Sequence, residues 1–325
     1  MENIESQEEA GRTPSGNGRR VVRCIKEVLP IATRTALWII KITVGVSLAI
    51  LFLKYFNILP LFSDFISPVF NYLGLPGEAA LAYVTGYFVN VYAAISVAAS
   101  LELDVRAMTI LSVMVLCSHN MITETAVQKK SGSSAVRIVL VRTISAFFLA
   151  FVLNRFLPGE VVSASGSESG EELLLGAMLR EWAVSTLWLI LKMGVLIYSL
   201  SIMQKLLAEF GVIKLISKFL KPLLAVFGLP ARTSLLWIVA NILGLAYGAA
   251  IMIQESRSGK ISRGDIDLLN THISIAHSNF EDLFLLSSVG GIWYVLLLSR
   301  WLMAMVLVWL QRLEIFVADK IRSRI

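Results

Sequence analysis

Residues 118–124 read SHNMITE, and they directly follow the apolar run VRAMTILSVMVLC at residues 105–117. Residues 276–282 read AHSNFED and repeat the pattern, with a histidine, an asparagine and acidic residues inside apolar sequence. Ionisable groups are costly in hydrocarbon, and those that occur there usually have a functional role. These two polar segments therefore determine how the rest of the sequence is interpreted.

The chain around them has the composition of a membrane protein. Of its 325 residues, 56% are hydrophobic and only 16% are charged, and the mean hydropathy is +0.74. A soluble domain of this length could not hide so much apolar surface in one core. Apolar runs of about 20 residues, which cross roughly 30 Å of hydrocarbon, begin near residues 36, 79, 136, 183, 233 and 290. We therefore predict an all-α transmembrane protein with several spans.

The sequence also argues against several other classes of protein. Its two cysteines, Cys24 and Cys117, form neither a CxxC metal motif nor a disulfide framework. There is no HExxH zinc motif and no GxxxxGK[ST] nucleotide-binding loop. The net charge of +6 comes largely from loops and tails, which indicates topology signals rather than nucleic-acid binding. We predict that the protein is not an enzyme and has no catalytic residues, no cofactor, no resident metal ion and no nucleic-acid partner.

The chain contains an internal repeat. Segments of its first part resemble later segments in the same order: TALWIIK (35–41) and TLWLILK (186–192), YLGLPGEAAL (72–81) and VFGLPARTSL (226–235), VNVYAAI (89–95) and GLAYGAA (244–250), and LVRTISAFFLAFVLNRF (140–156) and LSRWLMAMVLVWLQRL (298–313). The histidine segments keep this order, and 23 residues separate both His119 from Arg142 and His277 from Arg300. We therefore predict a basic cytoplasmic tail at 1–30, a first repeat at 31–157, a Ser/Gly/Glu-rich linker at 158–177 and a second repeat at 178–325.

The positions of lysine and arginine indicate that the repeats have opposite orientations, because cytoplasmic loops retain basic residues. Residues 58–78 contain no lysine or arginine, whereas the equivalent residues 204–232 contain Lys205, Lys214, Lys218, Lys221 and Arg232. We predict two inverted-topology repeats, each with three full spans, one interfacial amphipathic helix and one re-entrant or broken helical segment. An alternative with eight full spans puts the lysine-rich segment outside.

The re-entrant segments are expected at 105–131, entering from the cytoplasm, and at 265–288, entering from outside. This arrangement keeps the basic residues near 129–137 and at the C-terminus inside the cell. It leaves the loop at 255–267 outside, although that loop contains Arg257, Lys260 and Arg263. The acidic residues Glu255, Asp265 and Asp267 balance those charges.

Inverted repeats with interrupted membrane segments are a recurrent plan of secondary transporters, which bind their solute near the midplane. Non-helical backbone at that depth is buried in protein or lines a water-filled cavity. Alignment on the histidines pairs Glu124 with Asp282 and Arg142 with Arg300, and we predict acid–arginine pairing in the core and histidines that titrate near neutral pH. The predicted substrate-binding residues are His119, Asn120, Thr123, Glu124, His277, Asn279, Glu281, Asp282, Arg142, Arg300, Asn90 and Asn241.

Structural roles for the same residues remain open. Polar residues in membrane helices often serve as interhelical hydrogen-bond partners only, and Asn90 and Asn241 fit that role as well as a binding role. A purely structural pairing of Arg142 and Arg300 with the acids is an equally good interpretation. For the histidines and their acids we favour a functional role, because four ionisable groups in matching positions exceed what packing requires.

The pattern of an apolar span, a GLP turn, a span with Gly and Asn, and a polar segment, twice over, resembles the Gate or "nucleoside recognition" domain. That domain occurs in concentrative nucleoside transporters, in the membrane part of the ferrous-iron transporter B and in spore maturation proteins A and B. The chain is similar to a fusion of the two spore maturation proteins over nearly its whole length beyond the N-terminal tail. The resemblance implies an integral bacterial membrane protein with paired re-entrant or broken helices, but no particular substrate.

The leading hypothesis is a secondary transporter or permease of the bacterial inner (plasma) membrane, with both termini cytoplasmic and alternating access about a midplane site. Its cargo is expected to be a small polar or anionic solute, nucleoside-like solutes included. The alternatives are a non-transporting assembly or accessory protein of the spore-maturation type and a divalent-metal permease, since imidazole and carboxylate suit iron, manganese or zinc. The expected partners are the lipid bilayer and the solute, and a homo-oligomer is left open.

Overall fold

A computed structural model describes residues 16–56, 58–101, 103–159, 175–242, 244–257, 259 and 261–323. Half of the predicted tail and most of the predicted linker lie outside these residues. The helices of the first half are α2 (Asn17–Tyr55), α3 (Leu59–Tyr72), α4 (Ala79–Phe88), α5 (Val91–Ala98), α6 (Val105–Ser118), α7 (Met121–Ser131) and α8 (Ala135–Phe156). Those of the second half are α9 (Leu175–Glu209), α10 (Val212–Phe219), α11 (Lys221–Val226), the short 3-10 helix η1 (Ala231–Thr233), α12 (Ser234–Ile242), α13 (Gly244–Arg257), α14 (Arg263–Ile275), α15 (Glu281–Ser288) and α16 (Trp293–Arg322).

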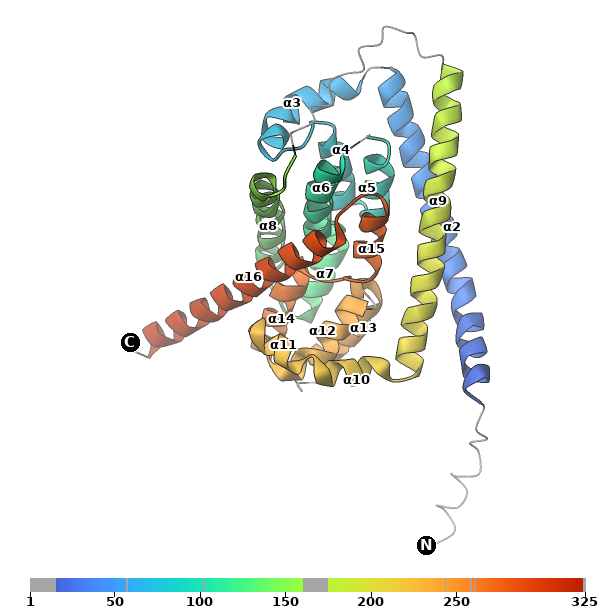
Figure 1. Ribbon diagram of the computed structural model, residues 1–325. Helices are drawn as coiled ribbons and strands as arrows, with labels where there is room; N and C mark the ends of the chain where they lie inside the picture. Colours follow the sequence, from blue (N-terminus) through green and yellow to red (C-terminus); the bar gives the residue numbers. More distant parts are fainter. Residues whose placement is uncertain are drawn as a thin grey trace.

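The described part of the chain is all-helical, and five of its segments are long and apolar enough to cross a membrane. They are α2, the combined segment Val105–Ser131, α8, α9 and α16. The segment Val105–Ser131, which comprises α6 and α7, is far more buried inside the protein than the other four. It lies at the centre of the fold, where α6 packs against α8, α4 and α16 (Figure 1). The predicted class, an all-α protein with several membrane spans, is confirmed.

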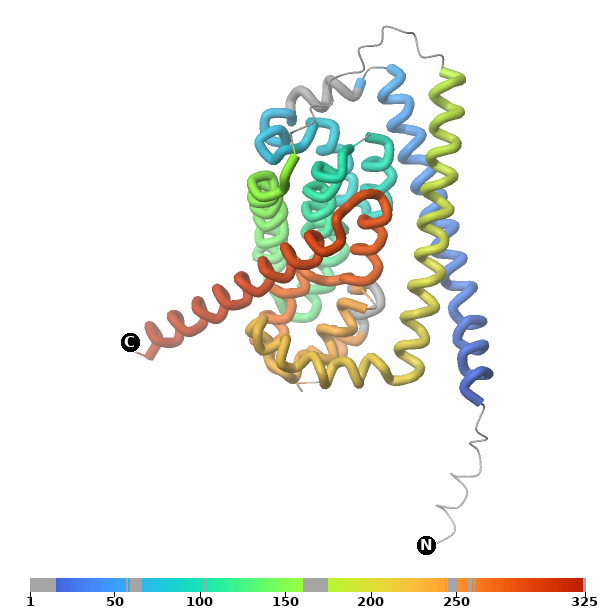
Figure 2. The backbone as a smooth tube through the Cα atoms, in the orientation of Figure 1, coloured from blue at the N-terminus to red at the C-terminus, as the bar shows by residue number. Residues whose placement is uncertain are grey.

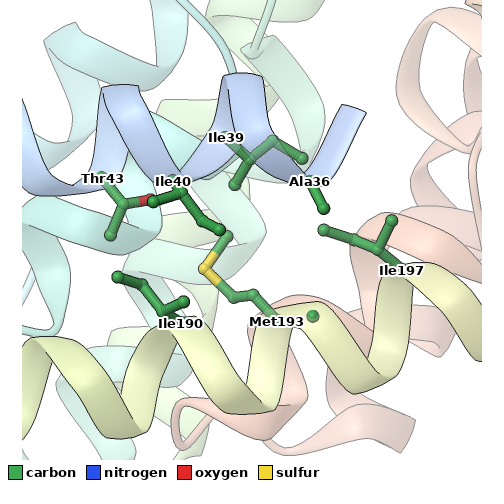
Figure 3. A pocket seen from close by; sticks show the side chains of 8 residues that line it. Ala36, Ile39, Ile40, Thr43, Ile190, Met193 and Ile197 are labelled. Atoms are coloured by element: carbon green, nitrogen blue, oxygen red, sulfur yellow. The ribbon is translucent and has the colours of Figure 1, made fainter. Parts of the chain in front are cut away.

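Helices α2 and α9 lie side by side and run in opposite directions along one side of the molecule (Figures 1 and 2). Polar contacts join them along their length: Glu27 with Lys205, Thr33 with Tyr198, and Ser47 with Trp182. Between these contacts the interface is apolar and contains a small cavity lined by residues such as Ile39 and Met193 (Figure 3). Each half of the chain therefore contributes one long outer helix to a shared antiparallel pair.

The polar segments lie in broken helices, while the apolar runs at 79 and 233 form hairpins. Helices α4 and α5 pack against each other, as do α12 and α13, and a Cβ on Gly86 would come within 3.0 Å of Ala94 Cβ. By contrast, α7 continues beyond the end of α6 (Figure 1). The sequence predicted uninterrupted spans at 79 and 233, where the structure has two short helices each, and re-entrant or broken segments at 105–131 and 265–288, where the structure has broken helices. Small residues such as Gly86 allow the close helix approach that a hairpin needs.

The two GLP motifs form equivalent turns, after α3 and after α11. Gly74 and Gly228 both have a φ of 75°, a left-handed conformation that glycine adopts without steric cost. The last helix of each half holds the turn: Asn154 Nδ2 donates to Tyr72 O at 2.9 Å, and Arg312 Nε donates to Gly228 O at 2.6 Å. The repeated motif thus ties each turn to the helix that ends its own half.

We predict that Gly228→Ala lowers the midpoint of thermal unfolding in detergent more than Gly211→Ala does. Both glycines have left-handed backbones, with φ of 75° and 69°, so each alanine costs about 1–2 kcal/mol of backbone strain. A Cβ at Gly228 would also lie 3.2 Å from the Trp309 ring, whereas nothing lies within 4 Å at Gly211.

Gly45→Ala is the control, because Gly45 lies within helix α2 and has open space around its Cβ position. Alanine there should leave the melting temperature unchanged or raise it slightly. Equal melting temperatures for Gly228→Ala and Gly211→Ala would contradict the contact between the GLP turn and α16.

Candidate functional site

The two broken helices bring the predicted histidines face to face. His119 follows the last residue of α6, and His277 lies in the break between α14 and α15. Their ring centroids are 5.2 Å apart with an interplanar angle of 32°, and each residue is 1% exposed. The two polar segments, which lie far apart in the sequence, therefore form one buried site.

The backbone at each break is held by the hairpin of the same half. Asn120 and Ser278 both have a φ of 50°, the left-handed conformation that ends a helix abruptly. Asn120 N donates to Gly86 O at 3.0 Å, and Ser278 N donates to Ala240 O at 3.2 Å. The N–H group freed by each break is thus satisfied inside the protein, as buried backbone requires.

Arg142 of α8 caps the broken end of α6. Its Nε donates to Cys117 O at 2.9 Å and its Nη2 to His119 O at 2.6 Å. The same Nη2 lies 2.8 Å from Glu124 Oε2. Carbonyl groups at the C-terminal end of a helix carry a partial negative charge and lack intrahelical donors, so a guanidinium group satisfies both needs.

Arg300 of α16 does the same for α14. Its Nη2 donates to His277 O at 3.2 Å and also to Asn279 Oδ1, and its Nε donates to Leu296 O at 3.2 Å. Both arginines are fully buried. Arg142 and Arg300, which were predicted to be equivalent, both donate to the backbone carbonyl of the histidine at the break.

The predicted acid–arginine pairing occurs in one half only. Arg142 pairs with Glu124, but among the described residues Arg300 has no carboxylate within ion-pair distance. Asp282 instead lies 3.2 Å from His119 Nε2, across the boundary between the halves. Asn279 occupies the position on Arg300 where an acid was expected.

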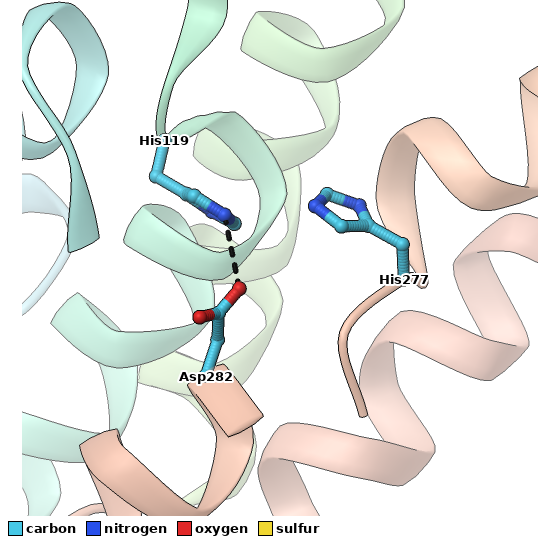
Figure 4. A group of neighbouring side chains, drawn as sticks. All are labelled: His119, His277 and Asp282. Carbon is cyan, nitrogen blue, oxygen red and sulfur yellow. Dashed lines mark ion pairs between the residues drawn. The ribbon is translucent and has the colours of Figure 1, made fainter. Parts of the chain in front are cut away.

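The centre of the site contains four side chains, two imidazoles and two carboxylates, that contact one another. Glu124 Oε1 lies 3.2 Å from both His119 Nε2 and His277 Nε2. Asp282 Oδ2 lies 3.2 Å from the same atom, His119 Nε2 (Figure 4). Every member is 8% exposed or less. We call this set the central cluster: His119, Glu124, His277 and Asp282.

The hydrogen-bond partners of the histidines fix their tautomers. His119 Nδ1 lies 3.0 Å from Val115 O, and His277 Nδ1 lies 2.7 Å from Ile273 O. A carbonyl oxygen only accepts, so Nδ1 carries a hydrogen in both rings. The Nε2 atoms therefore point into the central cluster, toward the carboxylates.

The other predicted residues have separate contacts. Asn279 Nδ2 donates to Asn241 Oδ1, so this pair links the break of α14 to the hairpin α12–α13. Asn90 Oδ1 caps α5 by accepting from Ala93 N at 2.8 Å, which is a structural role. Thr123 is exposed and bonds back to Asn120 O, and so it takes no part in the buried site.

Two residues near the cluster were not predicted. Tyr92 donates its hydroxyl hydrogen to Glu281 Oε1, which joins α5 of the first half to α15 of the second. Gln204 of α9 donates to Ile242 O at 2.7 Å, at the end of α12. Tyr92 could have been found from the sequence, because it lies inside the repeated motif VNVYAAI. No sequence pattern indicated a role for Gln204.

Together, the five apolar helices and a buried polar centre built on two broken helices define a multi-pass helical membrane protein. Residues 36–154 match the Gate family, described as nucleoside recognition. The chain is also 29% identical over 264 residues to a protein named "Uncharacterized membrane protein YvoD" of Bacillus subtilis strain 168, covering 79% of this chain and 84% of that protein. No solved structure matches the chain. The match to the Gate family model agrees with the resemblance predicted from the sequence and lies in the first half of the chain.

We predict that Arg142→Met strongly destabilises the protein. The change removes the ion pair with Glu124 and leaves the Cys117 and His119 carbonyls without their donor. Breaking a buried pair by removing one partner costs about 3–5 kcal/mol, which thermal unfolding in detergent would detect.

Arg155→Met provides the matched control, since Arg155 lies on the same helix and is exposed. Its melting temperature should stay close to that of the wild type. If Arg142→Met melted at the wild-type temperature as well, the guanidinium would not be needed to stabilise the break.

Proposed function

We propose that the protein is a secondary transporter or permease that carries a small polar solute by alternating access around the central cluster. The supporting observation is that both halves of the chain contribute to this cluster, each from a break in its own buried helix. Such breaks at the interface of two repeats are where secondary transporters bind their cargo. The proposal assigns binding rather than catalysis to these side chains.

An inverted relationship between the halves supports this mechanism. Elements of the same order lie at opposite ends of the molecule: α3 follows α2 at one end, and α10 follows α9 at the other (Figure 1). The bonds Asn120 N to Gly86 O and Ser278 N to Ala240 O are equivalent. Two similar units of opposite direction can exchange conformations, which opens the shared site to each side in turn.

The observed hairpins also improve the agreement between the topology and the basic residues. With α4–α5 and α12–α13 as re-entrant hairpins and the broken helices as spans, each half crosses the membrane three times. Residues 129–137, 204–232, 257–263 and the C-terminal end of α16 then all lie on one side. These stretches are basic, so this side is the cytoplasm by the positive-inside trend. The proposed location is the bacterial inner membrane, with both termini inside.

The site contains hydrogen-bond acceptors and donors that a solute could contact. The carboxylates accept hydrogen bonds, and Arg142 and Arg300 each have a buried Nη1 without a partner among the described residues. Because the other guanidinium nitrogens are engaged by carbonyls and by Asn279 or Glu124, the arginines are poorly placed to hold an anion. The description of the Gate family, nucleoside recognition, makes nucleosides a ligand class to test.

One observation favours a second candidate, a non-transporting assembly or accessory protein. The members of the central cluster are buried and bond to one another, as expected if they only hold the halves together. Transport requires a second state in which this cluster is reached from the aqueous phase. Flux measurements separate the two candidates.

We predict that proteoliposomes with the wild-type protein accumulate at least one solute from a panel of nucleosides, organic acids and divalent metals. Glu124→Gln and Asp282→Asn, which remove charge with little change of shape, should reduce that flux at least about tenfold because they alter groups in the binding site. Glu181→Gln, at an exposed position on α9, should transport like the wild type. An absence of flux for the whole panel, with folded variants, would support the accessory role instead.

A second prediction concerns topology. In a Cys24→Ser/Cys117→Ser background, Lys130→Cys and Arg263→Cys should both be protected from an impermeant maleimide added outside intact cells. Ala99→Cys, between α5 and α6, should be labelled. All three positions are exposed, so access depends on the side of the membrane. Labelling of Arg263→Cys from outside would restore the earlier assignment of the loop at 255–267.

A further inference from the structure

We propose that the central cluster binds a divalent transition-metal ion. One ligand atom from each of His119, His277 and Asp282 lies within 4.8 Å of the others. Glu124 Oε1, from the first half, offers a fourth possible ligand atom, 3.2 Å from both Nε2 atoms. His119, His277 and Asp282 thus form the centre of the candidate metal site, and Glu124 lies beside both imidazoles.

Three contacts within the cluster have the spacing of neighbouring ligand atoms in a metal site. When bonds to nitrogen and oxygen are about 2.0–2.2 Å long, adjacent ligand atoms of a tetrahedral site lie about 3.3–3.5 Å apart. The three histidine–carboxylate contacts of the cluster are each 3.2 Å. The other pairs among His119, His277 and Asp282 lie within 4.8 Å, so binding would draw these side chains closer together.

The histidines are oriented as metal ligands usually are. A ligating histidine typically donates its other ring N–H to a carbonyl or carboxylate, which fixes the ring and the tautomer. His119 and His277 both do so, each to the carbonyl four residues earlier in its own helix. Arg142, in turn, holds the second oxygen of Glu124 at 2.8 Å.

The same tautomers create a need for a cation. With hydrogen on Nδ1, a neutral ring directs the Nε2 lone pair toward a carboxylate oxygen that also has only lone pairs. His119 Nε2 faces two such oxygens, of Glu124 and Asp282. A metal ion between these atoms would satisfy all of them, whereas a proton on each Nε2 would serve the His119–Asp282 and His277–Glu124 contacts but not also the contact of His119 with Glu124.

The donor set also defines the class of ion. Imidazole suits zinc, iron, cobalt or nickel, while magnesium and calcium prefer oxygen ligands only. The two carboxylates balance the charge of a divalent ion. Binding of the ion is independent of transport, whereas its assignment as the cargo rests on the function proposed above.

The test uses the full-length protein, purified in detergent and stripped with a chelator. After dialysis against zinc or cobalt, elemental analysis should find a single ion per chain, and bound cobalt should show the visible absorption of a low-coordinate nitrogen–oxygen site. An excess of magnesium or calcium should not displace it. The inference is overturned if neither zinc nor cobalt binds stoichiometrically, or if magnesium or calcium displaces them.

Matched variants locate the ion. Asparagine keeps a donor where His119 and His277 have Nδ1 but removes the Nε2 atom, so the double change His119→Asn/His277→Asn should abolish stoichiometric binding. His272→Asn is the control, since His272 is equally buried but bonds to Trp237 through Nδ1 and lies outside the cluster. Retained binding in the double variant would overturn the site. The measurements on the wild type stand even if a variant fails to fold.

Flux measurements then separate this inference from the proposed function. Metal binding without movement of any solute into proteoliposomes would mean a metal site in a protein that does not transport. Movement of another solute by a protein that binds no metal would uphold transport and exclude the metal site. Accumulation of the metal inside the vesicles, lost in the double variant, would support both.

Discussion

The carbonyl groups at the broken ends of α6 and α14 impose the constraint on which the rest of the structure depends. A break in a helix at membrane depth frees backbone groups that water cannot reach, and each unsatisfied group costs several kcal/mol. Arg142 and Arg300 reach these carbonyls from the last helix of each half. A charge that would be prohibitive in lipid becomes favourable here, because each arginine faces the negative end of one helix dipole.

The remaining contacts of the centre follow from that arrangement. Glu124 contacts both Arg142 and the imidazoles, whereas Asp282 contacts His119 of the other half. The hairpins also bind the breaks, because Gly86 O and Ala240 O accept hydrogen bonds from the backbone N–H groups there. The halves also meet at the apolar interface of α2 and α9, so a polar centre and an apolar outer pair are two distinct contacts between them.

Much of this organisation could be predicted from sequence, because a repeat reports equivalent positions directly. The 23-residue spacing linked His119 to Arg142 and His277 to Arg300, and the structure gives these pairs equivalent hydrogen bonds. Hydropathy could not distinguish a span from a hairpin, because both need about 20 apolar residues. The close approach of Gly86 to Ala94 is a packing feature that no hydropathy window detects.

The internal repeat could not predict which residues of the two halves contact each other. Alignment pairs Glu124 with Asp282 as equivalents, but it contains no information on which residue of the other half each one touches. The contact of Asp282 with His119 and that of Tyr92 with Glu281 depend on how the two units dock. Thr123, a predicted binding residue, is exposed, whereas its neighbour Glu124 is buried. The reason is that successive residues of a helix such as α7 point to different faces.

The unequal acids of the cluster have an evolutionary and energetic consequence. A homodimer of single repeats would have identical residues at both positions, whereas a fused chain can place a glutamate in one half and an aspartate in the other. Glu124, longer by one methylene group, reaches both histidines, while Asp282 contacts only His119. Exchanging the conformations of the two halves therefore does not reproduce the same set of contacts. Under the proposed alternating access, the two states would therefore differ in their contacts, which a symmetric dimer of single repeats cannot achieve.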